Sequence, residues 1–186
     1  MECKNMKVTT TDQGQAFFAT GIEKYLDAKS AVEMFENEVQ WRVKDVVKKH
    51  ELRLKKLFGE EHWVLKDYVE SAMPDAMYLG QKVAFKSFGI LYFYFSFWRD
   101  EDSHSCPSLC ATFYRERVTI LTPLWATVKE IHPKLDVYNN STFSMVRPVP
   151  ANDWASCEKA LKALIGDWIK LWEKLGGLPK YLPKAR

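Results

Sequence analysis

The sequence predicts a single α+β domain, in which a long N-terminal helix and a C-terminal helix pack on a mainly antiparallel sheet of three or four strands. Two observations predict this class. Apolar residues recur at helical spacing in the first and last parts of the chain, whereas they alternate, as in half-buried strands, between about residues 83 and 149. A run of helices followed by a run of strands is typical of an α+β arrangement. With 186 residues, the chain is long enough to bury one core without a metal or a disulfide.

The first third of the chain is predicted to be mostly helical. Residues 1–14 carry no apolar period and are expected to form a loose arm, and a short helix is predicted near residues 17–26. Ser30 and Glu33 have the spacing of a capping box, which predicts the start of a long helix that ends at Gly59. One apolar stripe recurs along this helix every three or four residues: Val32, Phe35, Val39, Val43, Val46, His50, Leu54 and Leu57.

The middle of the chain is predicted to contain one more helix and then the strands. The helix is expected from Glu60 to Ala72, because apolar residues keep a helical spacing there and Pro74 would end it. The strands follow. The alternation of the third slips across Arg115-Glu116-Arg117, which predicts a bulge or a bend there, and the fourth is the least marked. The strands are expected near residues 83–85, 88–98, 109–121 and 142–149.

Two helices complete the prediction. Thr122-Pro123 has the form of a helix start, which predicts a short helix to about Ile131. The C-terminal helix is expected to begin at Asn152 or Asp153 and to end at Gly176-Gly177, and Gly166 within it is expected to mark the close approach of another backbone. Residues 178–186 are predicted to form a basic tail that contains two prolines.

The aromatic strand, residues 88–98, offers the first candidate binding surface. One side of the strand holds residues that suit a face covered by helices: Leu91, Phe93, Phe95 and Phe97. Tyr92, Tyr94 and Trp98 fall on the other side, and their amphipathic rings are typical of surfaces that bind another molecule. This second face either binds a partner or is covered by helices of the same chain, and both hypotheses remain open.

The long helix offers a second candidate surface. Trp41 and Leu52 lie well off its apolar stripe, and a large apolar side chain on a solvated helix face indicates a contact, either with another helix of the chain or with a partner.

The same helix also has a basic segment, residues 42–56, which supports nucleic-acid binding as an alternative function. These cations surround the helix without forming a single stripe, so a solvated helix matched to its own dipole explains them as well. The candidate nucleic-acid-binding residues are Arg42, Lys44, Lys48, Lys49, Arg53, Lys55 and Lys56.

Two further kinds of site have weak signals in the sequence, a zinc site and a nuclease-like site. His104, Cys106 and Cys110 could supply three zinc ligands, but their spacing matches no paired Cys-x-x-Cys motif, so a polar hairpin loop is the preferred interpretation and no metal or cofactor is expected. Glu116 is the residue to test for a degenerate nuclease-like enzyme, although the Glu-x-Lys spacing typical of such nucleases is absent.

Composition limits the remaining function classes. The N-terminal residues lack the apolar region of a secretory signal, and the longest apolar stretch is about half the length of a membrane-spanning helix, so we expect a cytoplasmic protein that does not enter a membrane. A net charge of +3 does not by itself imply a polyanionic partner. The sequence therefore favours a non-enzymatic interaction module, such as an inhibitor, an immunity-type protein or an adaptor, whose partner is another protein and whose oligomeric state is open.

Overall fold

A computed structural model describes most of the chain. The described residues are 12–60, 63–73, 76–85, 88–98, 107–115, 121–133, 135–138, 141–149 and 153–182. The chain divides into two compact units, residues 1–38 and residues 39–186. In the first unit, the described residues belong to helix α1 (Asp12–Lys49), which crosses the boundary between the units. The second unit contains the sheet and the other helices.

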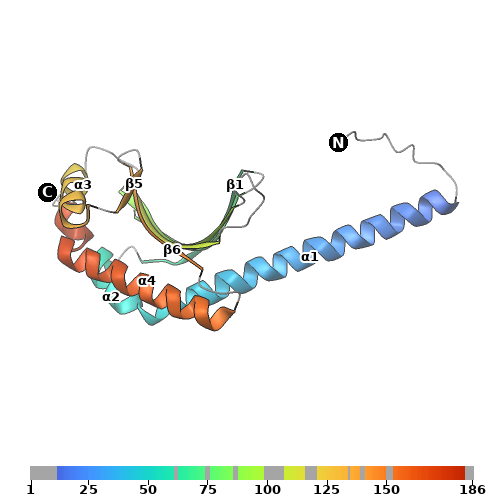
Figure 1. Cartoon of the computed structure of the whole chain (residues 1–186), viewed down its shortest axis with the longest axis horizontal. Helices are drawn as coiled ribbons and strands as arrows, with labels where there is room; N and C mark the ends of the chain where they lie inside the picture. The colour runs from blue at the N-terminus through green and yellow to red at the C-terminus, as the bar shows by residue number, and fades with distance from the viewer. Residues whose placement is uncertain are drawn as a thin grey trace. The chain divides into compact units, whose positions relative to one another are not determined.

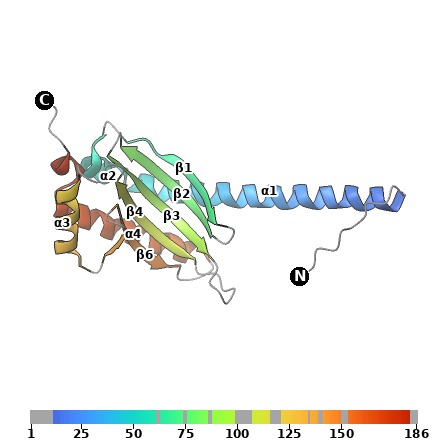
Figure 2. The same cartoon turned by 90° about the horizontal axis from the view of Figure 1, so that it is seen from above.

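The described strands form one antiparallel sheet in the order β1-β2-β3-β4-β6-β5. Their bounds are β1 Lys66–Met73, β2 Ala76–Phe85, β3 Gly89–Trp98, β4 Ser108–Arg115, β5 Asp136–Tyr138 and β6 Thr142–Pro148. The predicted α+β class is confirmed, but three or four strands was too few: the described residues contain five strands of seven to ten residues and the three-residue β5. Figure 2 shows the longer strands side by side above helices α2 and α4.

Strand β1 lies where a helix was predicted from Glu60 to Ala72, so that prediction is wrong. β1 is an edge strand paired only with β2 among the described strands. Its Tyr68 is buried, whereas Val69, on the opposite side, is about half exposed. Because an edge strand buries so few side chains, its sequence lacks the apolar alternation that would have revealed it.

The predicted long helix is two helices. Helix α1 begins at Asp12, so Ser30 lies inside it and does not cap its start. The same helix includes residues 12–14, which were predicted to belong to the arm, and residues 17–26, which were predicted to form a separate short helix. At His50 the backbone leaves helical values (φ −108°, ψ 4°), and helix α2 (Glu51–Phe58) begins at the next residue. The predicted end at Gly59 is confirmed, and its φ of 97° is one that glycine adopts readily.

The apolar stripe of this segment is buried only in its second half. Val39, Val43, Val46, Leu54 and Leu57 belong to the core. In contrast, the two earliest stripe residues are about half exposed: Val32 and Phe35.

The last two helices agree closely with the sequence. Helix α3 (Thr122–Ile131) carries a proline in its first turn, as predicted. Helix α4 (Trp154–Leu175) begins after Asp153, whose side-chain oxygen accepts a hydrogen bond of 2.8 Å from the backbone N–H of Ser156. The expected close approach at Gly166 is wrong, because a Cβ added there would have no neighbouring atom within 4 Å.

The chain after α4 continues into a short 3-10 helix, Leu178–Tyr181, inside the predicted tail. Leu178 is buried in the core, and the Tyr181 hydroxyl donates a hydrogen bond of 2.8 Å to the carbonyl of Leu175. Residues 183–186 of the predicted tail and residues 1–11 of the predicted arm lie outside the described residues.

Helices cover one face of the sheet. The sheet curves strongly, and α2 and α4 lie on its convex side (Figure 1). Phe113 of β4 marks the centre of this core, with its ring centroid 5.2 Å from that of Trp172 in α4 and 6.4 Å from that of Phe58 in α2. The predicted inward face of the aromatic strand is confirmed, because Leu91, Phe93 and Phe95 are buried on this side and Phe97 is partly buried against the same core.

Candidate functional site

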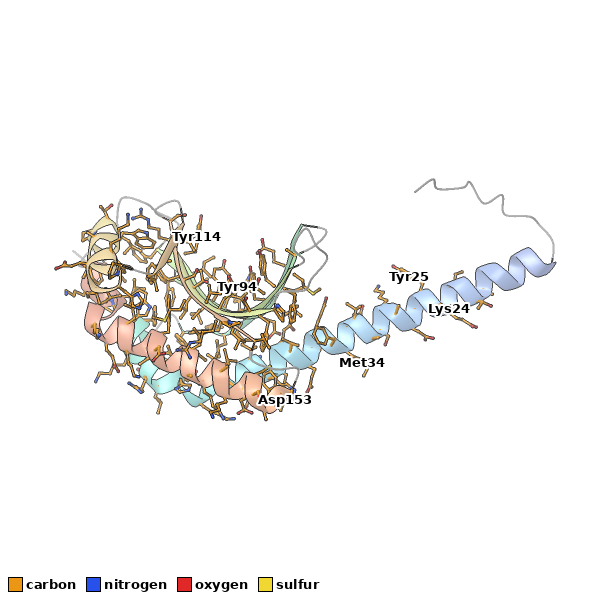
Figure 3. The ribbon with its side chains drawn as sticks, in the orientation of Figure 1. Lys24, Tyr25, Met34, Tyr94, Tyr114 and Asp153 are labelled. Atoms are coloured by element: carbon orange, nitrogen blue, oxygen red, sulfur yellow. The ribbon has the colours of Figure 1, made fainter. Side chains whose placement is uncertain are left out.

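The opposite, concave face of the sheet is rich in tyrosine. Alternation along each strand and the register between strands place one set of side chains on this face, which we call the tyrosine face. Its aromatic members are Tyr68 of β1, Tyr78 of β2, Tyr92 and Tyr94 of β3, and Tyr114 of β4. No described helix of the second unit lies over this face (Figure 1), and Tyr94 and Tyr114 project on the concave side in Figure 3.

The register explains how the rings meet. Gly80 of β2 lies between Tyr68 and Tyr94 in the ladder and contributes no side chain. The rings of Tyr68 and Tyr94 therefore approach across it, with centroids 5.7 Å apart in an edge-to-face arrangement. The Tyr68 ring is also 4.7 Å from that of Tyr92, and the Tyr78 ring is 5.5 Å from that of Tyr94. Four tyrosines from three strands thus form one continuous cluster.

Hydrogen bonds fix two of the phenol groups. The Tyr68 hydroxyl donates to a Glu70 carboxylate oxygen at 2.7 Å. The Tyr94 hydroxyl accepts a bond from Thr112 Oγ1 at 3.4 Å, and Thr112 Oγ1 is 2.9 Å from Ser144 Oγ in a second hydroxyl pair. A row of hydroxyl groups therefore runs from β3 across β4 to β6.

Burial keeps the centre of the tyrosine face uncharged. Loss of contact with water raises the pKa of Tyr68 and of Tyr94 well above the ordinary tyrosine value. The same cause raises the pKa of the Cys110 thiol, which is hydrogen-bonded to Tyr94, to about 11. All three groups therefore stay neutral at pH values at which an ordinary tyrosine or cysteine ionises.

The rim of the face is more exposed and carries its charges. Tyr114 is 38% exposed, whereas Tyr78, Tyr92 and Tyr94 are half-buried. Lys82 lies near the β1 edge with its Nζ 5.5 Å from the centroid of the Tyr68 ring. The arrangement is that of a neutral aromatic and hydroxyl centre with charge at its margin, which suits recognition of another molecule better than proton transfer.

The structure brings together only part of the predicted aromatic site. Tyr92 and Tyr94 lie in the cluster, while the side chain of Trp98 is outside the described part of the structure. Sequence reasoning missed Tyr68, because a helix was predicted there, and it missed Tyr78, which lies just before the predicted strand. Tyr114 could have been predicted from the alternation of the strand, since it lies on the opposite face of β4 from Phe113.

The other predicted partner-binding residues lie elsewhere. Trp41 belongs to α1 and is 62% exposed, and Leu52 belongs to α2 and is 83% exposed. Since they lie on two different helices, they do not extend one helical face as the sequence suggested.

Acidic neighbours offset much of the positive charge of the predicted basic segment. Four of its cations have a carboxylate partner, in the pairs Lys44–Asp67, Lys49–Asp45, Arg53–Glu173 and Lys55–Glu51, at nitrogen-to-oxygen distances between 2.6 and 3.7 Å. The Arg42 guanidinium lies 4.9 Å from the centroid of the Trp154 ring. Lys48 and Lys56 are exposed. The positive potential that would attract phosphates is thereby reduced along the segment.

The two other chemical hypotheses depend on residues that lie outside the described set. These are His104 and Cys106 for zinc and Glu116 for nuclease activity. Cys110 is buried on the tyrosine face. Within the described ranges, no group of three or more His, Cys, Asp or Glu side chains could hold a metal ion.

Comparisons with known proteins return no relative. No protein family model matches the chain, and no curated protein or solved structure shows a significant similarity to it. None of the helices in the described ranges is both long enough and apolar enough to cross a membrane.

Proposed function

We propose that this chain is a non-enzymatic protein-interaction module, and that the tyrosine face holds its partner. The observation that carries the proposal is the four-tyrosine cluster on the sheet face opposite helices α2 and α4. A solvated antiparallel sheet face commonly alternates apolar inward residues with polar outward ones. Here the described outward positions of β3 and β4 hold mainly phenol rings, hydroxyls and a thiol, and the charged side chains beside the cluster are Lys82 of β2 and Glu70 of β1.

This composition matches the centre of a protein interface. Interface centres are enriched in tyrosine and depleted in charged residues, because a ring contributes a large contact area at little conformational cost while its hydroxyl can still form a hydrogen bond. Their ring contacts, together with the hydroxyl contact of Tyr94, also hold Tyr92 and Tyr94 in place before any partner arrives. We infer that the partner presents a convex surface with an apolar centre and hydrogen-bonding groups around it.

The first test compares capture of the partner by variants of the full chain. Tyr114→Ala removes a partly exposed ring at the rim of the face. It should leave the circular dichroism spectrum and the unfolding midpoint near those of the parent, and it should weaken partner capture at least about tenfold, which corresponds to about 1.4 kcal/mol. The measurement is quantitative mass spectrometry of proteins retained from a lysate of the native host.

A matched control removes an equally large ring elsewhere. Tyr25 is an exposed tyrosine in the first unit, and Tyr25→Ala should retain capture. Undiminished capture by Tyr114→Ala would reject the tyrosine face as the site. Loss of capture in Trp41→Ala, with Tyr114→Ala unaffected, would move the site to helix α1.

Nucleic-acid binding through residues 42–56 is the alternative function. The acidic neighbours of Lys44, Lys49, Arg53 and Lys55 argue against it. Binding to duplex or single-stranded oligonucleotides with an affinity that falls steeply as salt rises would support it over the protein-interaction proposal.

A further inference from the structure

A second surface with distinct chemistry lies at the β6 side of the sheet. A cavity of about 470 Å³ is lined there by β6, helix α4 and the segment that joins α3 to β5. Its lining combines apolar side chains, among them Met145 and Leu171, with cations from β6 and α4. It is separate from the tyrosine cluster, which is built on β1, β2 and β3.

The cavity occupies the place where β5 would continue if it were longer. β5 pairs with β6 only from Tyr138 opposite Thr142 to Asp136 opposite Ser144. Before β5, the backbone N–H of Leu135 donates a hydrogen bond of 3.0 Å to the carbonyl of His132, so the chain turns away from β6. From Met145 to Pro148, β4 is the one described strand that pairs with β6.

The ladder shows which backbone groups face the cavity. Two hydrogen bonds place the Ser141 carbonyl and the Val149 N–H on the β4 side of β6: Arg115 N–H to the Ser141 carbonyl at 2.8 Å, and Val149 N–H to the Pro107 carbonyl at 3.1 Å. Because backbone groups alternate sides along an antiparallel strand, the N–H and C=O of Val146 point away from β4. Pro148, the next position on that side, has no N–H to offer.

Charge around the cavity is predominantly positive. Arg147, Lys170 and Lys174 contribute three cations to the lining, while Asp167 contributes one carboxylate. Asp167 already forms ion pairs with Arg147 and, at 3.2 Å, with Lys170. An incoming acidic group would therefore meet a net positive surface.

We propose that this edge binds an extended acidic peptide segment of a partner, which continues β5 by pairing antiparallel with β6 at Val146. Strand addition of this kind draws affinity from backbone hydrogen bonds and specificity from alternate side chains. A peptide residue opposite Val146 shares its face and should be apolar. Its two neighbours share the face of Met145 and Arg147, toward α4, and should be acidic.

The probe follows from that alternation. It is a fluorescein-labelled peptide of three Glu-Val repeats with blocked ends, titrated with the full chain and followed by fluorescence anisotropy. A Lys-Val peptide of the same length is the control probe. We expect the Glu-Val peptide to bind at least about tenfold more tightly than the Lys-Val peptide, with an affinity that falls as salt rises. Equal binding of the two peptides, or no binding of either, would overturn the proposal.

Two variants test the backbone and the charges separately. Val146→Pro removes the outward N–H of Val146 without touching the β4 ladder, as proline is tolerated at sheet edges, and should weaken Glu-Val binding about tenfold or more. The double variant Lys170→Gln with Lys174→Gln keeps the backbone intact and should weaken binding of the Glu-Val peptide by a similar factor. On the same helix but outside the cavity lining, Lys159→Gln with Lys162→Gln is the matched control and should bind as the parent does.

The outcomes separate this site from the tyrosine face. Parent-like affinity in both the proline and the double-glutamine variants would overturn the proposal, and the double variant decides alone if the proline variant does not fold. Tyr114→Ala should bind the Glu-Val peptide as the parent does. If it loses the peptide while Lys170→Gln with Lys174→Gln retains it, the peptide binds on the tyrosine face and the edge proposal is rejected.

Discussion

At the scale of single residues, glycine decides whether the tyrosine cluster can form. Gly80 lies directly between Tyr68 and Tyr94 in the ladder. A Cβ placed there would stand 2.6 Å from the Tyr94 Cα and 2.8 Å from its Cβ, closer than real side chains approach. A methyl group at this position therefore forces the strands or the ring apart.

Gly80→Ala should lower the free energy of unfolding by roughly 1–3 kcal/mol, the usual cost of overpacking a well-filled site. It should also change the near-ultraviolet circular dichroism of the tyrosines, because the Tyr68 and Tyr94 rings would lose their contact. Urea unfolding measures the first effect.

Gly166 is the matched control for this substitution. It lies inside α4, where an added Cβ has no neighbour within 4 Å, so Gly166→Ala should raise the free energy of unfolding by roughly 0.5–1 kcal/mol through helix propensity alone. Destabilisation by Gly166→Ala together with stability in Gly80→Ala would contradict the packing described for both sites.

The residue pattern predicted which face of the sheet a side chain occupies better than it predicted which side chains contact one another. The alternation in the aromatic strand correctly separated Leu91 and Phe93, which are buried under helices, from Tyr92 and Tyr94. It could not show that Tyr68 joins them, because that contact depends on the pairing of β1 with β2 and on the missing side chain at Gly80. Contacts between strands are set by register, which one sequence does not reveal.

At the scale of elements, the wrong predictions come from residue patterns that fit more than one kind of secondary structure. Leu65, Tyr68, Val69 and Ala72 fit a helical period, yet they lie in and beside strand β1. The alternate positions of that strand are Lys66, Tyr68 and Glu70, which mix charge with one ring and so resemble no half-buried strand. Pairing with β2 overrode the local pattern.

The break between α1 and α2 was hidden for a related reason. His50 falls on the apolar stripe, so the three- and four-residue spacing continues through the interruption without a change. Periodicity reports which side of a helix is buried but does not report that the helix axis is continuous.

His50 also makes the junction of α1 and α2 sensitive to pH. Partial burial, aided by the positive charges of Arg53 and Lys162, lowers the pKa of His50 below its ordinary value of 6.5. At pH values between the folded-state pKa of His50 and about 6.5, the unfolded chain binds more protons than the folded chain. The contribution of His50 to stability is therefore complete above about pH 6.5 and is lost as the pH falls through the folded-state pKa.

The urea midpoint of the parent should therefore fall more between about pH 7.5 and about pH 5.5 than that of His50→Gln. Carboxylates titrate alike in both proteins, so the difference between them isolates the imidazole. An equal fall in the two proteins would show that His50 is not desolvated in the fold.

At the scale of the whole molecule, the second unit buries its core on one face of the sheet and leaves the other face for the proposed partner site. The convex face, covered by α2 and α4, holds the apolar core around Phe113 and Trp172. The proposed partner site is on the concave face, where Tyr92 and Tyr94 are ordered by neighbouring strands. A variant at the rim of the concave face can therefore lose binding and keep its fold, which makes the proposal testable by substitution.

The most direct measurement is site-specific photocrosslinking in the native host. Benzoylphenylalanine replaces Tyr114 on the tyrosine face in one strain, and Val64, an exposed residue between α2 and β1, in another. We expect irradiation to yield a discrete covalent adduct with one partner protein from position 114 and none from position 64. An adduct that forms at position 64 but not at position 114 would contradict the claim that the tyrosine face is the binding surface.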